Sequence, residues 1–479
     1  MNVAPSPTIA VVGGGISGLA AAYRLRRLLG ADARIVLIEQ TDRLGGKLRT
    51  VELAGLRYDV GAEAFLNRRP EAVALATEVG LAHDLVHPAG ARSMVLAGGV
   101  TRYIPPRTVM GVPAGPDAVR DVLSADGLRA VAAEPGLPPV RLAGADAGLG
   151  ALLRERFGAE LVDRLVDPLL GGVYAGTVDG LGLRATLPAI AGALDRGATS
   201  LTAAAAAALP DAEFVDATPV FATLRGGLGG LVDALTERSD VDIRLGVPVR
   251  ALTRLDRGWR LDLGAVPAAH APPDPVLDAD AVLLAVPAPA ARRLLDGVAD
   301  PAARALARVE VASMAVVGLA LPPGTELPDS SGVLIGSGER HADGNPYTAK
   351  AFTFSARKWG HLGTAGPVLV RGSVGRHGDP GALRVDDAEL VRLVWADLAE
   401  LTGITAAPVD AVVTRWGGGL PQFGVGHLDL VESIERAVAK LPGLAVAGAV
   451  LRGVGIPACI AAADAAATTI AAGLGQGVA

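Results

Sequence analysis

Three closely spaced glycines near the N-terminus form the part of this sequence with the clearest chemical meaning. The segment GGGISG, residues 13–18, lies between the apolar stretches 8–12 and 19–29. This order predicts a buried strand, a tight turn and a helix. In such a unit Gly13 permits the turn, Gly15 lets a diphosphate approach the backbone, and Gly18 lets helix and strand pack closely. The helix N-terminus then favours the charge of the phosphates.

An acidic residue completes this pattern at the end of a second predicted strand. Glu39 ends the segment RIVLIE, residues 34–39, and follows Gly18 by 21 positions. Its carboxylate can accept hydrogen bonds from the ribose hydroxyls of a dinucleotide. Because strand, glycines, helix and acid stand in the required order, the sequence predicts a Rossmann-type dinucleotide-binding unit. An ordinary strand–helix turn is a poor alternative.

A second glycine-rich loop lies near the other end of the chain. Residues 444–448 (LAVAG) predict a strand, 452–459 (RGVGIPAC) a loop, and 460–473 an alanine-rich helix. Such a unit can return to the first sheet and direct its helix N-terminus at a ligand. Taken alone, a turn that closes the core explains this segment equally well. Together with the N-terminal unit, it predicts a second wall of the same site.

The elements that must position these loops alternate between strands and helices. Residues 241–263 predict strands with a turn at 256–258, and residues 280–286 predict another buried strand. Residues 147–170 show helical spacing of apolar side chains, and Pro168 is expected to end that helix. The fold class predicted from these patterns is α/β.

Composition narrows the function classes. The chain has 479 residues, of which 50% are hydrophobic and 20% charged, so it can bury several domain cores. Its net charge of −6 argues against nucleic acid as the main partner. The longest apolar runs, near 281–291 and 311–323, are shorter than the roughly 20 residues of a membrane span and contain prolines, so no transmembrane helix is expected. The N-terminus has no signal-peptide pattern.

Cysteine and histidine offer little for metal binding. Cys459 is the one cysteine, which excludes an internal disulfide and a cysteine-based metal site and fits a reducing, cytoplasmic compartment. His83 and His87 are four residues apart, but without a third ligand nearby a surface helix explains them better. No metal site is predicted.

Several longer segments resemble a known group of flavoproteins. RLGGKLRT at 43–50 resembles the extended fingerprint of FAD-containing, amine-oxidase-like flavoproteins. Four further segments resemble the bacterial protoporphyrinogen/coproporphyrinogen III oxidases, and the resemblance spans nearly the full length. They are RFGAELVDRLVDPLLGGVYAG at 156–176, KAFTFSARKWGH at 350–361, TRWGGGLPQFGVGHLDLV at 414–431 and RGVGIPACI at 452–460.

This resemblance implies three interleaved domains. A discontinuous Rossmann-type FAD-binding domain, of the amine-oxidase-like or p-hydroxybenzoate-hydroxylase-like kind, would comprise residues 1–65, 220–288 and 415–479. A mixed-sheet substrate domain would comprise 66–90, 185–219 and 289–414, and a helical domain 91–184. In some relatives the helical domain contacts membrane, so peripheral contact at the inner face of a membrane stays open.

The implied reaction is the six-electron oxidation of a porphyrinogen to a porphyrin. The resemblance implies non-covalent FAD, hydride transfer from substrate to flavin, and reoxidation by O2 with release of H2O2. Coproporphyrinogen III is the favoured substrate and protoporphyrinogen IX the alternative, because the chain is more similar to the single-chain Gram-positive enzymes. A ferrochelatase could then collect the product.

The resemblance also assigns cofactor-binding residues. Gly13, Gly15 and Gly18 match the diphosphate loop, Glu39 the ribose carboxylate, Val249 the strand beside the adenine, and Gly453–Ile456 the loop facing the flavin pyrimidine. The full set of predicted FAD contacts is Gly13, Gly14, Gly15, Ile16, Ser17, Gly18, Glu39, Gln40, Arg43, Gly45, Gly46, Lys47, Val249, Trp416, Gly448, Gly453, Val454, Gly455 and Ile456. Cys459 is expected to be a buried, small apolar residue.

The substrate residues follow from the chemistry of a porphyrinogen, a flat apolar ring edged by carboxylates. Its pocket should be apolar with a few cations. Candidates for carboxylate recognition are Arg49, Arg69 and Lys350, and candidates for ring packing are Phe65, Val173 and Tyr174. For each of the basic residues a solvated surface charge explains the sequence equally well. No general base is evident. Trp359, which follows Lys358, is expected to pack in the core and not to contact the substrate, because large aromatic side chains usually pack.

Two other functions compete with this interpretation. An amine oxidase or a carotenoid-type desaturase would share the fold, but amine oxidases line their site with aromatics, which make up only 3% of this chain. A non-catalytic FAD-fold carrier is the second alternative. The intact RGVGIP loop disfavours it, because such carriers degrade that loop.

Overall fold

Both glycine-rich loops belong to one parallel sheet. The computed structural model describes residues 6–210, 219–264, 275–363 and 366–476. In this sheet every neighbouring pair of strands is parallel. The strand order is β12 (Asp242–Arg244), β2 (Arg34–Ile38), β1 (Thr8–Val12), β16 (Ala281–Leu284) and β22 (Leu444–Val446). The predicted strands are confirmed, and the loops after β1 and β22 leave the same edge of the sheet.

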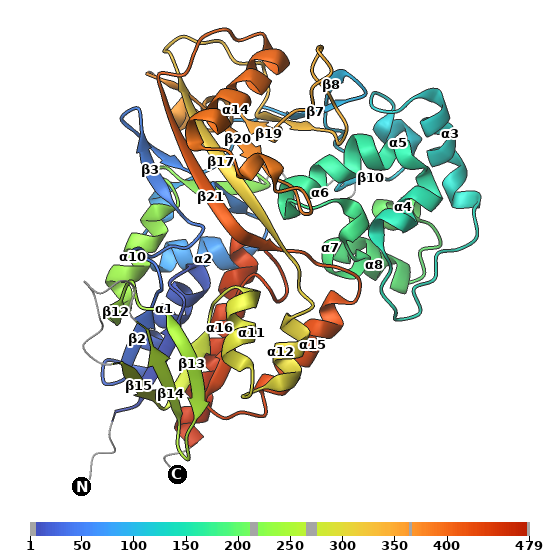
Figure 1. The fold of residues 1–479 in the computed structure, drawn as a ribbon. Helices are drawn as coiled ribbons and strands as arrows, with labels where there is room; N and C mark the ends of the chain where they lie inside the picture. The colour runs from blue at the N-terminus through green and yellow to red at the C-terminus, as the bar shows by residue number, and fades with distance from the viewer. Residues whose placement is uncertain (1–5, 211–218, 265–274, 364–365, 477–479) are drawn as a thin grey trace.

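Alternation of side chains places a separate core on each face of this sheet. Ile9 and Val11 of β1 lie in the core shared with three helices, whereas Ala10 and Val12 lie in the core of the opposite face. The first face is covered by α1 (Ile16–Leu29), α10 (Gly229–Ser239) and α16 (Ile456–Gln476) (Figure 1). The second is covered by an antiparallel sheet of β13 (Val249–Arg254), β14 (Trp259–Leu263) and β15 (Val276–Ala279), and by α11 (Ala288–Leu295), α12 (Asp300–Leu306) and α15 (His427–Val438).

A larger mixed sheet forms the second part of the molecule. Its order is β21 (Asp410–Pro421), β17 (Val311–Leu321), β20 (Val368–Val374), β19 (Ala349–Thr353), β18 (Gly332–Ile335), β7 (Ser93–Ala97) and β8 (Val100–Tyr103). Helix α14 (Asp387–Thr402) covers one face. The hairpin of β3 (Thr50–Leu53) and β4 (Leu56–Asp59) packs on the other face. The long strands β17 and β21 run from the parallel sheet towards α14 (Figure 1).

Short helices gather beside this sheet as the third part (Figure 1). They are α3 (Ala125–Ala133), α4 (Leu149–Phe157), α5 (Ala159–Leu161), α6 (Asp167–Tyr174), α7 (Leu183–Thr186), α8 (Pro188–Asp195) and α9 (Leu201–Ala208). They share one apolar core, which Phe423 also enters.

The expected end of the 147–170 helix at Pro168 is wrong. Helix α4 ends at Gly158, whose φ is +78°, and the chain continues through a π-helical turn, Val162–Val166, into α6. Pro168 is the second residue of α6, and the backbone before it is already helical. The shifted hydrogen-bond pattern of the π-turn accommodates the proline within a continuing helix.

The proposed division into three domains stays a prediction, but several elements lie across its boundaries. The hairpin β7–β8, in the range given to the helical domain, forms the edge of the mixed sheet. Helices α7, α8 and α9 share the core of the other short helices. Helices α11 and α12 pack beneath the parallel sheet. Chain order alone does not reveal which core each element joins.

One helix among the described residues, Ile456–Gly475 of α16, is long and apolar enough by length and composition to cross a membrane. Small and polar residues interrupt its apolar run, so the expectation of no such helix did not include it. In this fold its buried side chains, among them Ile460, Ala463 and Ile470, lie in the same core as α1. This packing contributes to the 33% of the apolar window that is buried.

Candidate flavin and substrate site

The turn between β1 and α1 is too tight for any side chain at two of its glycines. The Gly13 N–H donates to Ile38 O at 2.8 Å, and the φ of Gly13 is +107°. A Cβ on Gly18 would lie 1.8 Å from Gly13 O, closer than any real contact. Glycine at these positions therefore serves the fold of the turn itself.

Gly15 differs, because the space beside it is open. A Cβ on Gly15 would meet only the Gly46 Cα, at 4.0 Å. Gly15 and Gly45 form an isolated parallel bridge, and the Gly45 N–H donates to Gly14 O at 2.8 Å. Two loops without side chains thus lie side by side at the N-terminus of α1, where Ile16 and Ser17 begin the helix. Bare backbone and a helix N-terminus suit a diphosphate.

Glu39 lies at the rim of this cradle. Its Oε2 accepts from the Gly14 N–H at 2.7 Å, and its Oε1 accepts from the Thr41 N–H at 2.8 Å and the Thr41 hydroxyl at 2.9 Å. The Val247 N–H donates to Glu39 O at 2.9 Å, which brings the start of β13 and Val249 alongside. Oε2, which accepts only one of these hydrogen bonds, keeps a second lone pair for a ligand hydroxyl. Gln40 is exposed.

The segment after β2 gathers cations beside Trp416. The Arg43 guanidinium donates to Leu44 O and to Gly46 O, at 3.1 and 2.9 Å, and its carbon lies 5.7 Å from the centroid of the Trp416 ring. Burial, and then the charge of Arg49, lower the pKa of Arg43. Burial also lowers the pKa of Lys47. The Trp416 indole N–H donates to Val60 O at 3.2 Å.

The C-terminal loop closes the cradle opposite the first turn. Gly448 has a φ of +125°, and a Cβ there would lie 4.0 Å from the Ser17 Oγ. Helix α16 begins at Ile456, directly after Gly453, Val454 and Gly455. The prediction for Cys459 is confirmed: it is buried, and burial raises the pKa of its thiol. The long helix directs its positive end at this loop.

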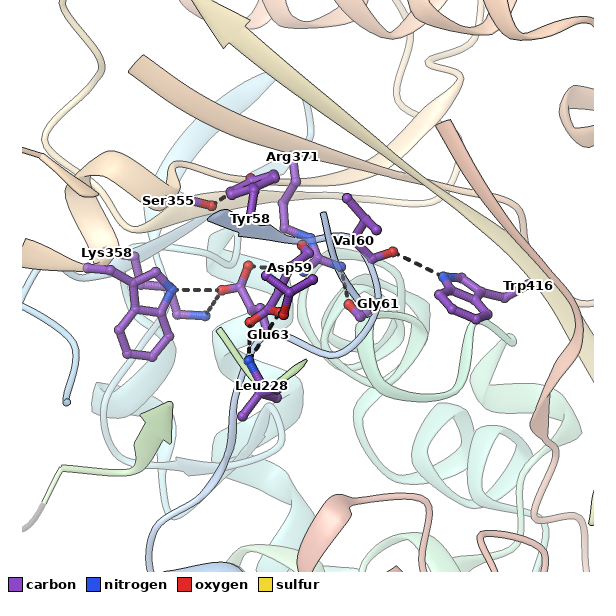
Figure 2. Close-up of polar contacts among 12 residues, drawn as sticks. Tyr58, Asp59, Val60, Gly61, Glu63, Leu228, Ser355, Lys358, Arg371 and Trp416 are labelled. Atoms are coloured by element: carbon purple, nitrogen blue, oxygen red, sulfur yellow. Dashed lines mark hydrogen bonds and ion pairs between the residues drawn. The ribbon is translucent and has the colours of Figure 1, made fainter. Parts of the chain in front are cut away.

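A buried ion cluster holds the β4–β5 connection against the mixed sheet (Figure 2). Glu63 accepts from Lys358 Nζ at 2.5 Å, from the Arg371 guanidinium at 3.1 Å and from the Trp359 indole at 3.3 Å. Arg371 also donates to Gly61 O at 2.7 Å. Burial opposes ionisation of Glu63, but Lys358 and Arg371 outweigh it and lower its pKa to about 2.

This cluster decides the role of Lys358 and Trp359. Trp359 is 2% exposed, so the expectation of a core tryptophan is confirmed. The Lys358 ammonium, which follows strand β19 of the mixed sheet, forms an ion pair with Glu63 in the loop after β4. The pair therefore fixes the mixed sheet to the loop that follows β4.

Asp59, at the end of β4, is a buried acid beside this cluster. It accepts from the Thr50 hydroxyl at 2.5 Å and from the Leu228 N–H at 3.0 and 3.1 Å. Burial raises the pKa of the Asp59 carboxyl to about 6, despite these hydrogen bonds. Burial likewise raises the pKa of Tyr58, whose hydroxyl lies 2.9 Å from the Ser355 Oγ.

The raised pKa of Asp59 predicts a specific pH dependence of stability. Between about pH 4 and pH 6 the folded carboxyl keeps its proton while the unfolded one loses it, so this group lowers the free energy of unfolding as pH rises. In the wild type this group should lower the free energy of unfolding by about 2–3 kcal/mol between about pH 4 and pH 6, and in Asp59→Asn this decrease should be absent. Urea unfolding at pH 4, 5, 6 and 7 measures it. The exposed Asp278→Asn is the control, and equal pH slopes in wild type and Asp59→Asn would contradict the assignment.

The predicted substrate residues lie in different surroundings. Arg69 is exposed and paired with Glu71 at 2.5 Å, while Arg49 is half-buried near Arg43. Phe65 lies in the core beneath the parallel sheet. Val173 on α6 is 40% exposed.

Tyr174 and Lys350 are both buried. The ring of Tyr174 packs 5.5 Å from that of Phe423, and burial raises the pKa of its hydroxyl to about 12. Burial lowers the pKa of Lys350 to about 7. Of the substrate candidates, Val173 therefore has an exposed apolar side chain, whereas Lys350 has a basic side chain that is closed off from solvent.

The histidine pair lies outside any α-helix. His83 lies in a 3-10 turn, Ala82–Asp84, and is exposed, whereas His87 follows strand β6 (Leu85–Val86) and its Nδ1 lies 3.1 Å from Phe221 O. The surface helix expected for them is wrong, because the segment turns back as a strand. Within the described residues, no group of three or more His, Cys, Asp or Glu side chains could hold a metal ion.

The sequence did not predict the ion pair of Glu63 and Arg371, which joins the loop after β4 to the mixed sheet. Glu63 and Arg371 each stand alone among apolar neighbours, in GAEAF and VLVRGSV. A charged residue inside a stretch that otherwise reads as buried signals a paired partner elsewhere. The partner itself, from a strand 308 positions away, is visible only in the fold.

Comparison with known proteins agrees with this geometry. The sequence profile of the flavin-containing amine oxidoreductases matches residues 16–471. The chain belongs to this family. This flavin oxidoreductase is 44% identical over 465 residues to a coproporphyrinogen III oxidase of Mycobacterium tuberculosis, with 96% of each chain covered. It is 31% identical to a coproporphyrinogen III oxidase of Bacillus subtilis, with 94% of this chain and 95% of the relative covered.

A solved structure from Exiguobacterium, assigned as a protoporphyrinogen oxidase, shares the fold of this flavin oxidoreductase. Its TM-score is 0.84 at 30% identity, with 98% of this chain and 99% of that chain covered. The resemblance to porphyrinogen oxidases and the α/β flavoprotein fold are therefore confirmed. That the cradle described above holds the flavin stays a prediction.

Proposed function

We propose that this flavin oxidoreductase oxidises coproporphyrinogen III to coproporphyrin III, with non-covalent FAD and with O2 as the electron acceptor. The observation that carries this proposal is the 44% identity to a coproporphyrinogen III oxidase over 96% of both chains. The proposed product would be a substrate for a metal-inserting ferrochelatase.

The cradle fits FAD. The bare backbone of Gly15, beside Gly46, and the N-terminus of α1 would hold the diphosphate. Glu39 would bind the ribose, and the backbone near Val249 would face the adenine. FAD, when bound, accepts hydride from the substrate and passes the electrons to O2.

The protein's own groups would orient the flavin and keep it from covalent attachment. The N–H groups at the start of α16, after Gly453, would stabilise negative charge on the ring. Cys459 is unsuited to a covalent link, because burial keeps its thiol protonated. Trp416, held by its bond to Val60 O, and the nearby Arg43 would fix one side of the pocket.

Substrate recognition would combine apolar packing with carboxylate binding. We place Val173 and Tyr174 of α6, with Phe65 supporting from the core, along the ring of the porphyrinogen. Arg49 and Arg69 would bind carboxylate arms from the rim. Arg69 would exchange its exposed pairing with Glu71, which is worth little in water, for a substrate carboxylate.

Porphyrin fluorescence in air tests this function. Purified yellow protein is given coproporphyrinogen III and protoporphyrinogen IX in parallel, and kcat/KM is compared with autoxidation in the presence of heat-denatured protein. We expect at least about a tenfold preference for coproporphyrinogen III, because site cations left without their carboxylates are costly. Preference for protoporphyrinogen IX, the substrate class in the name of the Exiguobacterium neighbour, would support the second candidate. Rates no faster than autoxidation with both would refute the proposal.

A further inference from the structure

Lys350 is set apart from its strand by a β-bulge. Ala349 pairs with Val374 and Ala351 with Ser373, so Lys350 is the extra residue opposite no partner in β20. Ala349 lies in the core beneath α14, and its N–H donates to the Asp397 carboxylate at 2.6 Å. A bulge re-aims the side chain it carries. Here it directs Lys350 to the face opposite α14.

The Lys350 ammonium has no anion beside it. The residue is 4% exposed, and among the described residues its Nζ atom is buried without any hydrogen-bond partner. The charged group that acts on it is Arg376, another cation. A buried lysine amine without any partner is unfavourable with or without its proton, and a bound anion would relieve that cost.

Arg376 faces the same space and is incompletely satisfied. One of its terminal nitrogens donates to Ile335 O at 3.2 Å, and the other approaches the backbone of Gly171 on α6. Asp167 is the acid that most favours its charge. The Asp167 oxygens, however, already accept from the Val178 N–H at 2.8 Å and the Ser337 hydroxyl at 2.5 Å. Lys350 is therefore buried beside a partly buried arginine, and among the described residues Asp167 and Asp379 favour the charge of Arg376 while no acid acts on Lys350.

This space lies on the substrate side of the mixed sheet. Trp416 pairs with Met314, and the next row joins Ala315 to Val374 and Val374 to Ala349. Lys350 thus lies nearly level with Trp416 but three strands away, or about 14 Å at a strand spacing of about 4.8 Å. Trp416 borders the flavin cradle. A flat macrocycle placed along this face from the flavin would reach Lys350 with one of its arms.

We propose that Lys350 and Arg376 form a binding subsite for one carboxylate arm of the tetrapyrrole substrate. This inference rests on the proposed function. A carboxylate can reach this subsite only if α6 moves, because the Lys350 side chain is closed off from solvent. The π-helical turn Val162–Val166 just before α6 supplies an irregular joint, and Gly171 and Gly172 leave the facing side of α6 without side chains.

Equilibrium binding of coproporphyrin III, a stable compound with four carboxylates, tests the subsite. In Lys350→Met holoenzyme we expect the Kd to rise about 10- to 100-fold, the worth of a charge-assisted hydrogen bond. The melting temperature should rise at the same time, because methionine removes an unpaired buried charge and keeps the volume. Lys440→Met, at an exposed lysine, is the matched control and should change neither.

The paired readouts separate a ligand role from a structural one. Arg376→Met should weaken binding similarly, and the double variant should lose less than the sum of both. A Kd unchanged within twofold in Lys350→Met, or a lowered melting temperature, would overturn the subsite. Wild type that binds coproporphyrin III but oxidises no porphyrinogen would refute the proposed function alone. Wild type that oxidises coproporphyrinogen III but binds no coproporphyrin III would overturn the subsite alone.

Discussion

Glu63→Gln is expected to lower the free energy of unfolding by about 2–4 kcal/mol at pH 7, because it leaves Lys358 and Arg371 without their shared anion. One amide oxygen cannot accept from two cations and the Trp359 indole together, and the amide N–H groups would face those donors. The value lies towards the lower end for buried pairs because all three side chains retain some exposure. Urea unfolding measures the loss.

The effect of Glu63→Gln should depend on pH with a defined sign. The folded pKa of Glu63 is about 2, below that of an unfolded glutamate, so its stabilising contribution is complete above about pH 4.3 and disappears as pH falls towards 2. The difference between variant and wild type should shrink accordingly. Glu389→Gln, which removes an exposed carboxylate paired with Arg392, is the control and should leave stability unchanged. If Glu63→Gln and Glu389→Gln have similar free energies of unfolding at pH 7, the cluster does not stabilise the contact between the mixed sheet and the loop after β4.

The second large effect distinguishes two glycines that the sequence motif treats alike. Gly15→Ala should fold, because φ is −74° there and the nearest atom to a new Cβ is 4.0 Å away. That Cβ would occupy the space of the diphosphate, so FAD should bind about 10- to 100-fold more weakly, the cost of a 1–3 kcal/mol overpacking. Flavin titration of the apoprotein gives the Kd.

Gly18→Ala should fail in a different way. Its Cβ would lie 1.8 Å from Gly13 O, a backbone atom that cannot move without breaking the turn. We expect a loss of about 3 kcal/mol or more in stability, or no soluble protein. Thermal unfolding of the two apoproteins separates the cases. If Gly15→Ala binds FAD with the same Kd as wild type, the diphosphate does not bind at this turn.

The order of elements around the cofactor cradle could be predicted well from the sequence. Strands β1, β2 and β22 and the loops after β1 and β22 lie close to their expected positions, because each is a short buried run bounded by glycines. Local chemistry suffices there: a turn needs φ above zero, and a helix N-terminus needs no side chain. The expectation for Cys459 followed from the same apolar pattern.

Prediction failed where distant segments decide the outcome. Pro168 continues a helix because a π-turn precedes it, and His87 ends in a loop because Leu85–Val86 pairs with β11 (Phe221–Leu224). Pro168 is the exception, because the π-turn lies within a few residues of it, but no simple sequence pattern predicts that turn.

The sequence by itself determined that this chain carries a dinucleotide-type cradle, since glycine spacing and one acid at a strand end are local requirements. It also carried the family resemblance. Only the tertiary structure decided which charges are paired. Lys350 and Lys358 lie eight residues apart, yet Lys358 meets Glu63 while Lys350 meets only another cation. The physical reason is that pairing and desolvation depend on what the fold places within a few ångströms, and those partners come from distant parts of the chain.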